Sequence, residues 1–166
     1  CGKSVKFING EANVVNWTAA AGSGGWGSCC SEMDIWEANS ISQATTTHPC
    51  TEEGLYKCEG TDCGDNGPER YEGVCDKDGC DLAPYRSGNT NFFGAGARFD
   101  VDSTKLMTVV TQFITEDGTD AGDLVEIKRI FVQDGKVIET PDATYGGKTY
   151  NSISDEMCAA QKEVFE

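Results

Sequence analysis

The residues with the clearest chemical potential are three acids within six positions, Glu32, Asp34 and Glu37. Two carboxylates on either side of a sugar linkage are the working groups of glycoside hydrolysis. The surrounding residues read as a strand, in which successive side chains alternate between faces, so Glu32 and Asp34 share a face and Glu37 points away. A β-bulge near Ile35 or Trp36 would bring all three acids onto one face.

Spacing alone permits this chemistry without requiring it. In a straight strand the backbones of Glu32 and Glu37 would lie about 16 Å apart, so both side chains must lean inward to reach one linkage. The alternative is an acidic strand edge that is only solvated.

The elements around the acids read mainly as strands. Residues 4–15 alternate around Asn9-Gly10 as a short hairpin, and residues 105–114 and 123–133 form two longer strands. The Asp134-Gly135 turn then leads into residues 136–139, which completes a meander. Residues 152–165 form the one predicted helix, with Ser152 and Asp155 placed like a capping box. This order predicts an all-β fold of the β-sandwich type.

The cysteines and the charge narrow the class of protein. Nine cysteines in 166 residues indicate an oxidising, secretory environment, and residues 49–86 hold five of them in a long loop region with bridges in place of a core. The net charge of −15 argues against nucleic acids and membrane surfaces as partners, whereas a neutral polysaccharide would not be repelled.

The sequence lacks residues that other kinds of catalytic and cofactor-binding sites need. His48 is the only histidine in the sequence, so a histidine-rich zinc site lacks its ligands and a Ser-His-Asp triad has no histidine elsewhere in the chain to use. The stretch 22–27 fits G-x-G-x-x-G but precedes a strand, where no helix N-terminus could hold a pyrophosphate. The acids of residues 76–79 lack a closing bidentate ligand for calcium. We therefore expect no cofactor and no metal.

Several motifs together resemble glycoside hydrolase family 7, the fungal cellobiohydrolases and endoglucanases. They are Glu32-Met-Asp34-Ile-Trp-Glu37 behind a Cys-Cys pair, Ser40-Ile-Ser, His48-Pro-Cys50, Lys6-Phe-Ile-Asn-Gly10, Cys75-Asp-Lys-Asp-Gly-Cys80, Pro84-Tyr-Arg86 and Val109-Val-Thr-Gln-Phe113. The resemblance covers nearly the whole chain. It implies a concanavalin-like jelly roll, of which this chain would be a partial domain, because the family's catalytic domain is more than twice as long. Residues 1–166 are thus expected to be an internal fragment of a single catalytic domain.

The resemblance also implies roles for the acids. Glu32 would be the nucleophile of a retaining hydrolase acting on β-1,4-glucan, and Glu37 the acid/base. Asp34 would hydrogen-bond Glu32 and hold it in the attacking orientation. His48 would lie near the acid/base, and Arg70, Asp78, Asp81 and Arg86 match positions that line the product-side sugar subsites. By composition alone a lone histidine such as His48 is more often structural, and the four loop residues have surface ion pairs as their alternative.

Eight cysteines allow 105 pairings, so the sequence leaves their connectivity open. The family pattern implies the pairs Cys1–Cys29, Cys50–Cys75, Cys58–Cys63 and Cys80–Cys158. It leaves Cys30 over, because the family's partner for this residue lies upstream of Cys1. A free thiol or a metal ligand is the alternative for Cys30.

Two classes of function remain open. The first is a secreted, monomeric cellulase, and the bridged loop from Cys58 to Cys80 resembles the tunnel roof of cellobiohydrolases, which favours release of cellobiose from chain ends over endo-action. The second is a non-catalytic glucan-binding β-sandwich, in which the acids only hydrogen-bond sugars. A binding module has no need for a nucleophile and a proton donor at this spacing.

Overall fold

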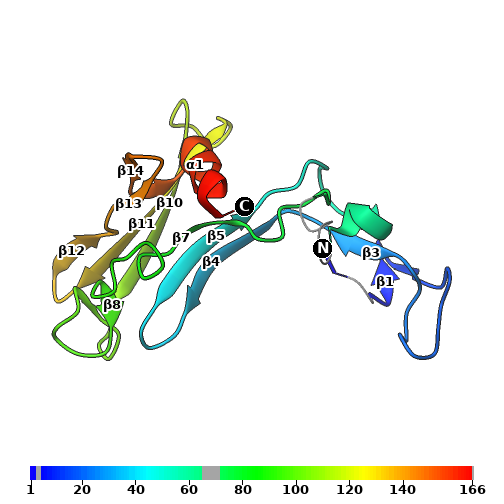
Figure 1. Ribbon diagram of the computed structural model, residues 1–166, viewed down its shortest axis with the longest axis horizontal. Helices are drawn as coiled ribbons and strands as arrows, with labels where there is room; N and C mark the ends of the chain where they lie inside the picture. Colours follow the sequence, from blue (N-terminus) through cyan, green and yellow to red (C-terminus); the bar gives the residue numbers. More distant parts are fainter. Residues whose placement is uncertain (3–4, 65–71, 166) are drawn as a thin grey trace. The chain divides into compact units, whose positions relative to one another are not determined.

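The computed structural model describes residues 1–2, 5–64 and 72–165. Over these residues the chain forms fifteen strands, one 3-10 helix and one α-helix (Figure 1), which confirms the predicted all-β class. The strands are β1 (Phe7–Ile8), β2 (Glu11–Ala12), β3 (Gly27–Cys29), β4 (Glu32–Ala38), β5 (Gln43–His48), β6 (Tyr56–Cys58), β7 (Cys80–Leu82), β8 (Phe93–Gly94), β9 (Val101–Asp102), β10 (Thr108–Thr115), β11 (Leu124–Gln133), β12 (Lys136–Glu139), β13 (Ala143–Tyr145), β14 (Lys148–Tyr150) and β15 (Ser152–Ile153). The helices are η1 (Gly60–Cys63) and α1 (Asp155–Phe165).

The chain divides into two compact units. The first comprises residues 1–33 and 47–79, and the second comprises residues 34–46 and 80–166. Strand β4 passes from the first unit to the second between Met33 and Asp34, and β5 returns to the first between Thr46 and Thr47.

The first unit opens with the predicted hairpin. Strands β1 and β2 pair antiparallel, with Phe7 opposite Ala12. The two turn residues have positive φ, 52° for Asn9 and 80° for Gly10. These dihedrals fit a type I′ turn, which Asn-Gly favours because both residues tolerate the left-handed region.

Disulfides form the core of the first unit. Cys29, Cys58, Cys63 and Cys75 are buried together, with Tyr56 and Val74 packed against them. Gly27 on β3 lies against this cluster, and a Cβ there would sit 2.6 Å from the sulfur atoms of both Cys58 and Cys63. The predicted bridged character of this loop region is confirmed for its described residues.

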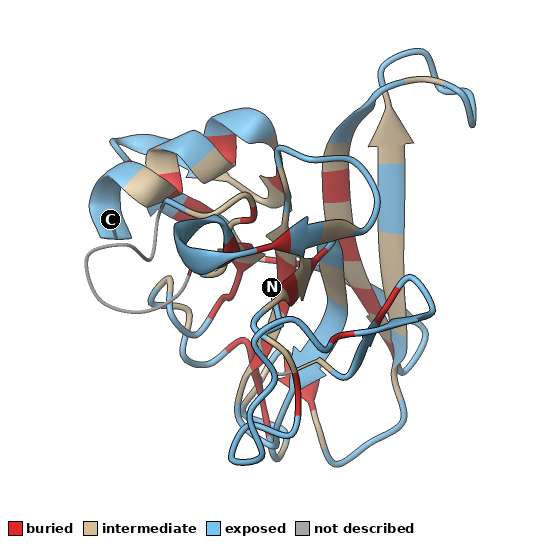
Figure 2. Ribbon diagram, turned by 90° about the vertical axis from the view of Figure 1, so that its right-hand side faces the viewer, coloured by how far each residue is buried: buried red, intermediate tan, exposed pale blue. Residues whose placement is uncertain are grey.

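The second unit contains the predicted meander. Strands β10, β11 and β12 lie side by side and antiparallel (Figure 1). Strand β15 also pairs with β11. Asp134 and Gly135 turn the chain with φ of 51° and 74°. Buried and half-buried residues alternate along most of β11, so one face of this strand points into the core. Figure 2 colours the residues by their burial.

A second sheet of the same unit has the order β4-β5-β7. It packs against the meander through aromatic rings. Trp36 of β4 makes edge contacts with Phe93 and Phe131 at centroid distances of 5.9 Å. Phe92, Phe93, Val101 and Phe131 form the buried cluster between them. Two sheets packed face to face through these side chains give the predicted sandwich.

Helix α1 begins three residues later than predicted. The Ser154 hydroxyl accepts a hydrogen bond from the Met157 amide at 3.2 Å, so Ser154 caps the helix in place of Ser152. Residues 152–153 instead form β15, which pairs Ile153 with Ile127 of β11 and buries the Ile153 side chain. Burial of Ile153 against the sheet therefore overrides the helical pattern.

The four disulfides of the described residues join Cys1–Cys29, Cys50–Cys75, Cys58–Cys63 and Cys80–Cys158. These are the same pairs that the resemblance implies. Cys30 is a free, exposed thiol.

Removing the Cys80–Cys158 bridge is expected to destabilise the full-length protein strongly. This disulfide fixes α1 to β7 and spans 78 residues, whereas Cys58–Cys63 spans 5. The loop-entropy model gives about 4.5 kcal/mol for the long loop and about 2 kcal/mol for the short one. Denaturant unfolding measures the free energy of unfolding of two double variants, Cys80→Ala/Cys158→Ala and Cys58→Ala/Cys63→Ala. A larger loss of this free energy in the variant that lacks the short-loop bridge would contradict the expectation.

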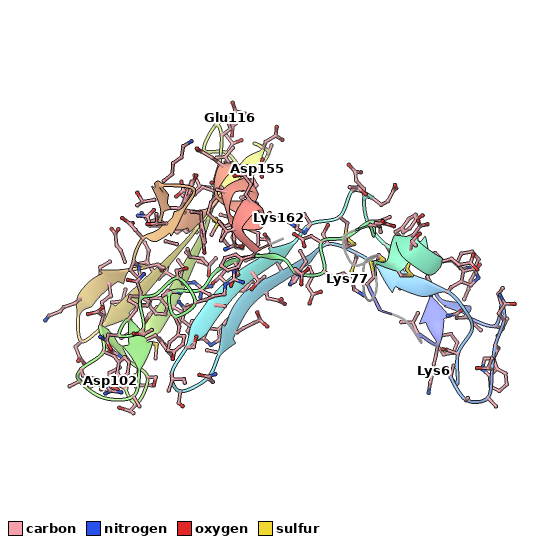
Figure 3. All side chains as sticks on the ribbon, viewed as in Figure 1. Lys6, Lys77, Asp102, Glu116, Asp155 and Lys162 are labelled. Carbon is pink, nitrogen blue, oxygen red and sulfur yellow. A yellow bond between two sulfur atoms is a disulfide. The ribbon has the colours of Figure 1, made fainter. Side chains whose placement is uncertain are left out.

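Asp102, labelled in Figure 3, organises the turn after β9. Its Oδ1 accepts hydrogen bonds from the Gly96 amide at 2.8 Å, the Thr104 amide at 3.0 Å and the Thr104 hydroxyl at 2.7 Å. The Thr104 hydroxyl and the two amides hold the pKa of the Asp102 carboxyl below its ordinary value. The folded protein therefore favours the ionised carboxylate.

This pKa shift predicts a pH-dependent contribution to stability. A carboxyl with a depressed folded pKa stabilises the fold above its unfolded pKa, about 3.9, and this stabilisation disappears as the pH falls through the folded value. The full-length protein is thus expected to exceed its Asp102→Asn variant in thermal midpoint near neutral pH, with the gap closing below about pH 4. A gap that is independent of pH would contradict this account.

Candidate active site

The hairpin of β4 and β5 carries the predicted acids of the second unit. A tight turn closes it, because the Asn39 amide donates to the Ser42 carbonyl at 3.0 Å. The Asn39 side chain also accepts hydrogen bonds from the amides of Ile41 and Ser42 at 2.9 and 3.0 Å. This Asx-type turn sets the pairing of the two strands without a glycine.

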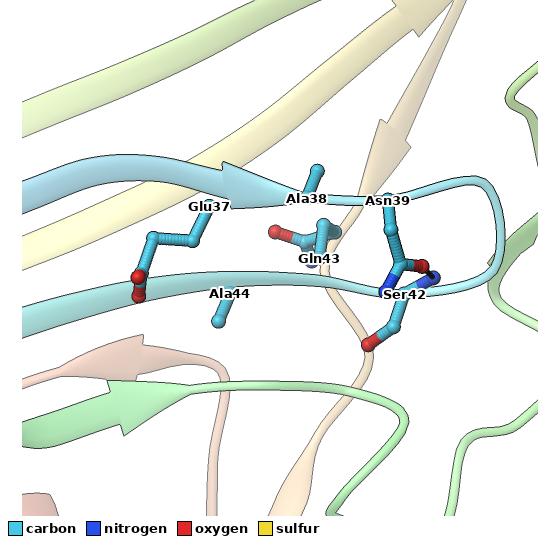
Figure 4. A pocket seen from close by; sticks show the side chains of 6 residues that line it. All are labelled: Glu37, Ala38, Asn39, Ser42, Gln43 and Ala44. Atoms are coloured by element: carbon cyan, nitrogen blue, oxygen red, sulfur yellow. Dashed lines mark hydrogen bonds between the residues drawn. The ribbon is translucent and has the colours of Figure 1, made fainter.

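Trp36 and Glu37 point to opposite faces of β4. Trp36 is 40% exposed, and its ring makes edge contacts with Phe93 and Phe131 of the sandwich core. Glu37 follows directly, so alternation turns it away from this core. The close view in Figure 4 places Glu37, Asn39, Ser42 and Ala44 on one side of the hairpin and Ala38 on the other.

The Glu37 carboxylate is exposed and hydrogen-bonded. Its Oε2 accepts from the Thr46 hydroxyl at 3.1 Å, across from β4 on β5. It also lines an open pocket of ≈ 270 Å³ with Asn39, Ser42 and Gln43 (Figure 4). Solvent access and a positioned carboxylate are the properties that a proton donor or acceptor needs.

The other two acids occupy the start of β4. Asp34 is half-buried and lies three residues before Glu37 in the same unit. Glu32 is the exposed first residue of the strand and belongs to the first unit. The predicted bulge, and a face shared by Glu32 and Glu37, stay predictions.

A buried arginine supports this strand from inside the sandwich. Arg129 of β11 donates hydrogen bonds from one terminal nitrogen to the Ile35 carbonyl and to the Thr111 hydroxyl. Its guanidinium carbon also lies 5.3 Å from the Trp36 ring centre. The segment between Asp34 and Glu37 is therefore held by a residue 94 positions further along the chain.

Two of the predicted binding residues lie in the described part of the first unit. His48 ends β5, and its Nδ1 lies 2.8 Å from the Asp76 carbonyl, which requires the Nδ1 proton to be the donor. Asp78 is exposed on the turn that precedes Cys80. Arg70 lies outside the described residues.

Asp81 and Arg86 are brought together in the second unit. They form an ion pair, with Asp81 half-buried on β7 and Arg86 exposed. The Arg86 guanidinium also lies 4.6 Å from the ring of Phe165 in α1. The arrangement fits a surface ion pair that could still present a guanidinium edge and a carboxylate to hydroxyl groups.

Sequence reasoning missed Thr46 and Arg129. Thr46 could have been found from the pairing that the Asn39 turn imposes, which brings it close to Glu37 across the hairpin. Arg129 stands in an alternating strand between Ile127 and Phe131, on the apolar face. A charged residue in such a position is the available signal, because arginine is rarely buried without a reason.

The described residues contain one group of potential metal ligands, the sulfur atoms of Cys1, Cys29 and Cys75, all within 4.8 Å of one another. All three cysteines are in disulfides and so cannot offer thiolates. Among the described segments there is no helix of the length and apolarity needed to cross a membrane.

Comparison with known proteins gives consistent results. The family model described as glycosyl hydrolase family 7 matches residues 1–166. A cellobiohydrolase of this family from Daphnia pulex is 54% identical with a TM-score of 0.84, and the match covers 97% of this chain and 38% of that protein. An endocellulase from Humicola insolens is 46% identical with a TM-score of 0.72, over 85% of this chain and 34% of that protein.

A cellobiohydrolase from Melanocarpus albomyces, solved in complex with cellotetraose, is 36% identical with a TM-score of 0.76. The match covers 97% of this chain and 36% of that protein. The chain thus spans little more than a third of the length of these solved proteins.

Proposed function

The chain belongs to glycosyl hydrolase family 7, and from this membership we propose that the protein containing it hydrolyses β-1,4-glucosidic bonds in cellulose with retention of configuration. The observation that carries the proposal is the placement of Glu37. Its carboxylate is open to solvent, is held by Thr46, and follows a tryptophan whose ring packs against Phe131. A solvated, positioned carboxylate on a strand with two further acids suits a carboxylate-pair mechanism.

In this mechanism Glu37 protonates the leaving glycosidic oxygen while Glu32 attacks the anomeric carbon. Glu37 then takes a proton from water, which displaces Glu32 from the covalent intermediate. Asp34 orients Glu32 through a hydrogen bond. Retention requires the two glutamate carboxyls to lie about 5 to 5.5 Å apart, so the full-length protein is expected to place both on one face.

The remaining predicted residues would bind sugars on the leaving-group side. Asp81 and Arg86 supply a carboxylate and a guanidinium within one ion pair. His48 is fixed through its Nδ1 by the Asp76 carbonyl, which orients the imidazole ring. Together with Arg70 and Asp78 they would hydrogen-bond glucose hydroxyls.

We place residues 1–166 within a single catalytic domain of a secreted, monomeric enzyme. The described residues expose many large apolar side chains, among them Trp36 at 40%, Phe113 at 51% and Leu124 at 52%. Surface of this kind needs a cover, which the rest of the domain would supply. The four disulfides suit an oxidising, extracellular setting.

The proposed action is release of cellobiose from chain ends, supported by the similarity to cellobiohydrolases from two organisms. Endo-action is the second candidate, supported by the similarity to an endocellulase. The full-length protein should be assayed on a soluble cellulose derivative for both viscosity and reducing ends. Reducing ends that appear with little loss of viscosity are expected, a rapid fall in viscosity would favour endo-action, and the absence of new reducing ends would contradict hydrolysis.

A further inference from the structure

The burial of Arg129 carries a desolvation penalty that lowers the stability of the fold. Its side chain is 1% exposed in the middle of β11, on the face that also carries Ile127 and Phe131. Its Nε and Nη1 atoms have no hydrogen-bond partner among the described residues. Burial lowers the pKa of the guanidinium to about 10, so it stays charged at neutral pH.

A buried charge of this kind is seldom kept for stability alone. Within the described part of the chain no carboxylate forms an ion pair with Arg129, and an apolar residue of similar volume would avoid the desolvation penalty. The contacts that the guanidinium does make are therefore informative about its role.

These contacts converge on one short stretch of β4. The Nη2 atom donates to the Ile35 carbonyl, and the guanidinium carbon lies 5.3 Å from the Trp36 ring. Nη2 also donates at 2.9 Å to the hydroxyl of Thr111, which lies opposite Arg129 on the neighbouring strand β10 of the same sheet and aims the guanidinium toward β4. Ile35 and Trp36 are the two residues between Asp34 and Glu37.

We propose that Arg129 is a positioning residue for the hydrolytic site: by holding the Ile35 carbonyl and the Trp36 ring, it fixes the orientation of β4 and thereby of the Asp34 and Glu37 carboxyls. The inference rests on the proposed function, because it assigns Arg129 to the same reaction. A misplacement of about 1 Å at such groups can cost roughly a hundredfold in rate.

Gln133 provides a matched control on the same face of β11. It is 6% exposed and makes three hydrogen bonds, to the Asp102 amide, the Asp102 carbonyl and the Leu106 carbonyl. None of these involves β4. Gln133→Met therefore removes a buried polar side chain from β11 without touching the hairpin.

The test compares Arg129→Met, Arg129→Lys and Gln133→Met in the full-length protein, with kcat and KM measured on a soluble cellooligosaccharide. Arg129→Met is expected to lower kcat roughly 10- to 100-fold with KM changed by less than about twofold. Arg129→Lys should recover part of kcat, because an ammonium can still donate to the Ile35 carbonyl. Gln133→Met should keep kcat within about twofold even though its thermal midpoint falls.

A kcat for Arg129→Met within about twofold of the unaltered protein, or an equal kcat loss in Gln133→Met, would overturn the positioning role. If Arg129→Met does not fold, the kcat of Thr111→Val tests the positioning role instead. This variant removes only the hydroxyl that aims the Arg129 guanidinium. A severalfold fall in kcat is then expected, and an unchanged kcat would overturn the inference. Hydrolysis by the unaltered protein is measured in the same assay, and its absence would contradict the proposed function itself.

Discussion

Replacing Glu32 with Gln in the full-length protein is expected to lower kcat on cellooligosaccharides by at least about a thousandfold. The amide keeps the shape of the side chain but cannot attack the anomeric carbon, so no covalent intermediate forms. KM should change little, because the sugar-binding residues remain. Steady-state kinetics of the purified variant, with its folded state checked by thermal unfolding, measure the effect.

Glu11→Gln is the matched control for this variant. Glu11 is an exposed glutamate on β2, in the same unit as Glu32. Loss of one surface carboxylate should leave kcat unchanged. Near-normal turnover by Glu32→Gln would refute its role as nucleophile.

Replacing Glu37 with Gln is expected to produce a loss that depends on the leaving group. Cleavage of a cellooligosaccharide needs a proton on the departing oxygen, so its kcat/KM should fall by roughly 10²- to 10⁴-fold. An aryl β-cellobioside has an acidic phenol as its leaving group, and this phenol departs without that proton. The first step on this substrate should therefore be largely preserved. Parallel assays on the two substrates measure this difference.

Azide extends the same experiment to stereochemistry. In Glu37→Gln a small anion can replace the water that the missing base would have activated, so azide should accelerate turnover of the aryl substrate. A retaining enzyme yields the β-glycosyl azide. Equal losses on both substrates would contradict the acid/base assignment, and an α-glycosyl azide would contradict retention.

Local sequence patterns were enough to predict the hairpins. Asn9-Gly10 and Asp134-Gly135 both adopt positive φ, and alternation defines the strands on either side of each turn. These features depend on neighbouring residues alone. They could therefore be read directly from composition and period.

Features that depend on distant residues were not predictable in the same way. The local pattern predicts the start of α1 three residues too early, because Ile153 pairs with Ile127, 26 positions before it. The burial of Arg129 is signalled by a charge on the apolar face of β11, but its partner Ile35 cannot be identified from either segment. The implied disulfide pairs came from family resemblance, since spacing allows 105 connectivities.

For the candidate site, the sequence supplied the residue types and the structure supplied part of their setting. The hydrogen bond from Thr46 and the packing of Trp36 against Phe131 explain how Glu37 is presented to solvent. Alternation alone would put Glu32 and Glu37 on opposite faces of β4, so a shared face needs the predicted bulge and stays a prediction. A shared face is what the proposed mechanism requires.

The most direct test of the mechanism is to trap its covalent intermediate. The full-length protein would be incubated with a 2-deoxy-2-fluoro-β-cellobioside that carries an activated leaving group, then digested and mapped by mass spectrometry. We expect one added fluoro-cellobiosyl group per protein, attached to the side chain of Glu32. Hydrolytically active protein that accumulates no adduct, or that carries the adduct on another residue, would contradict it.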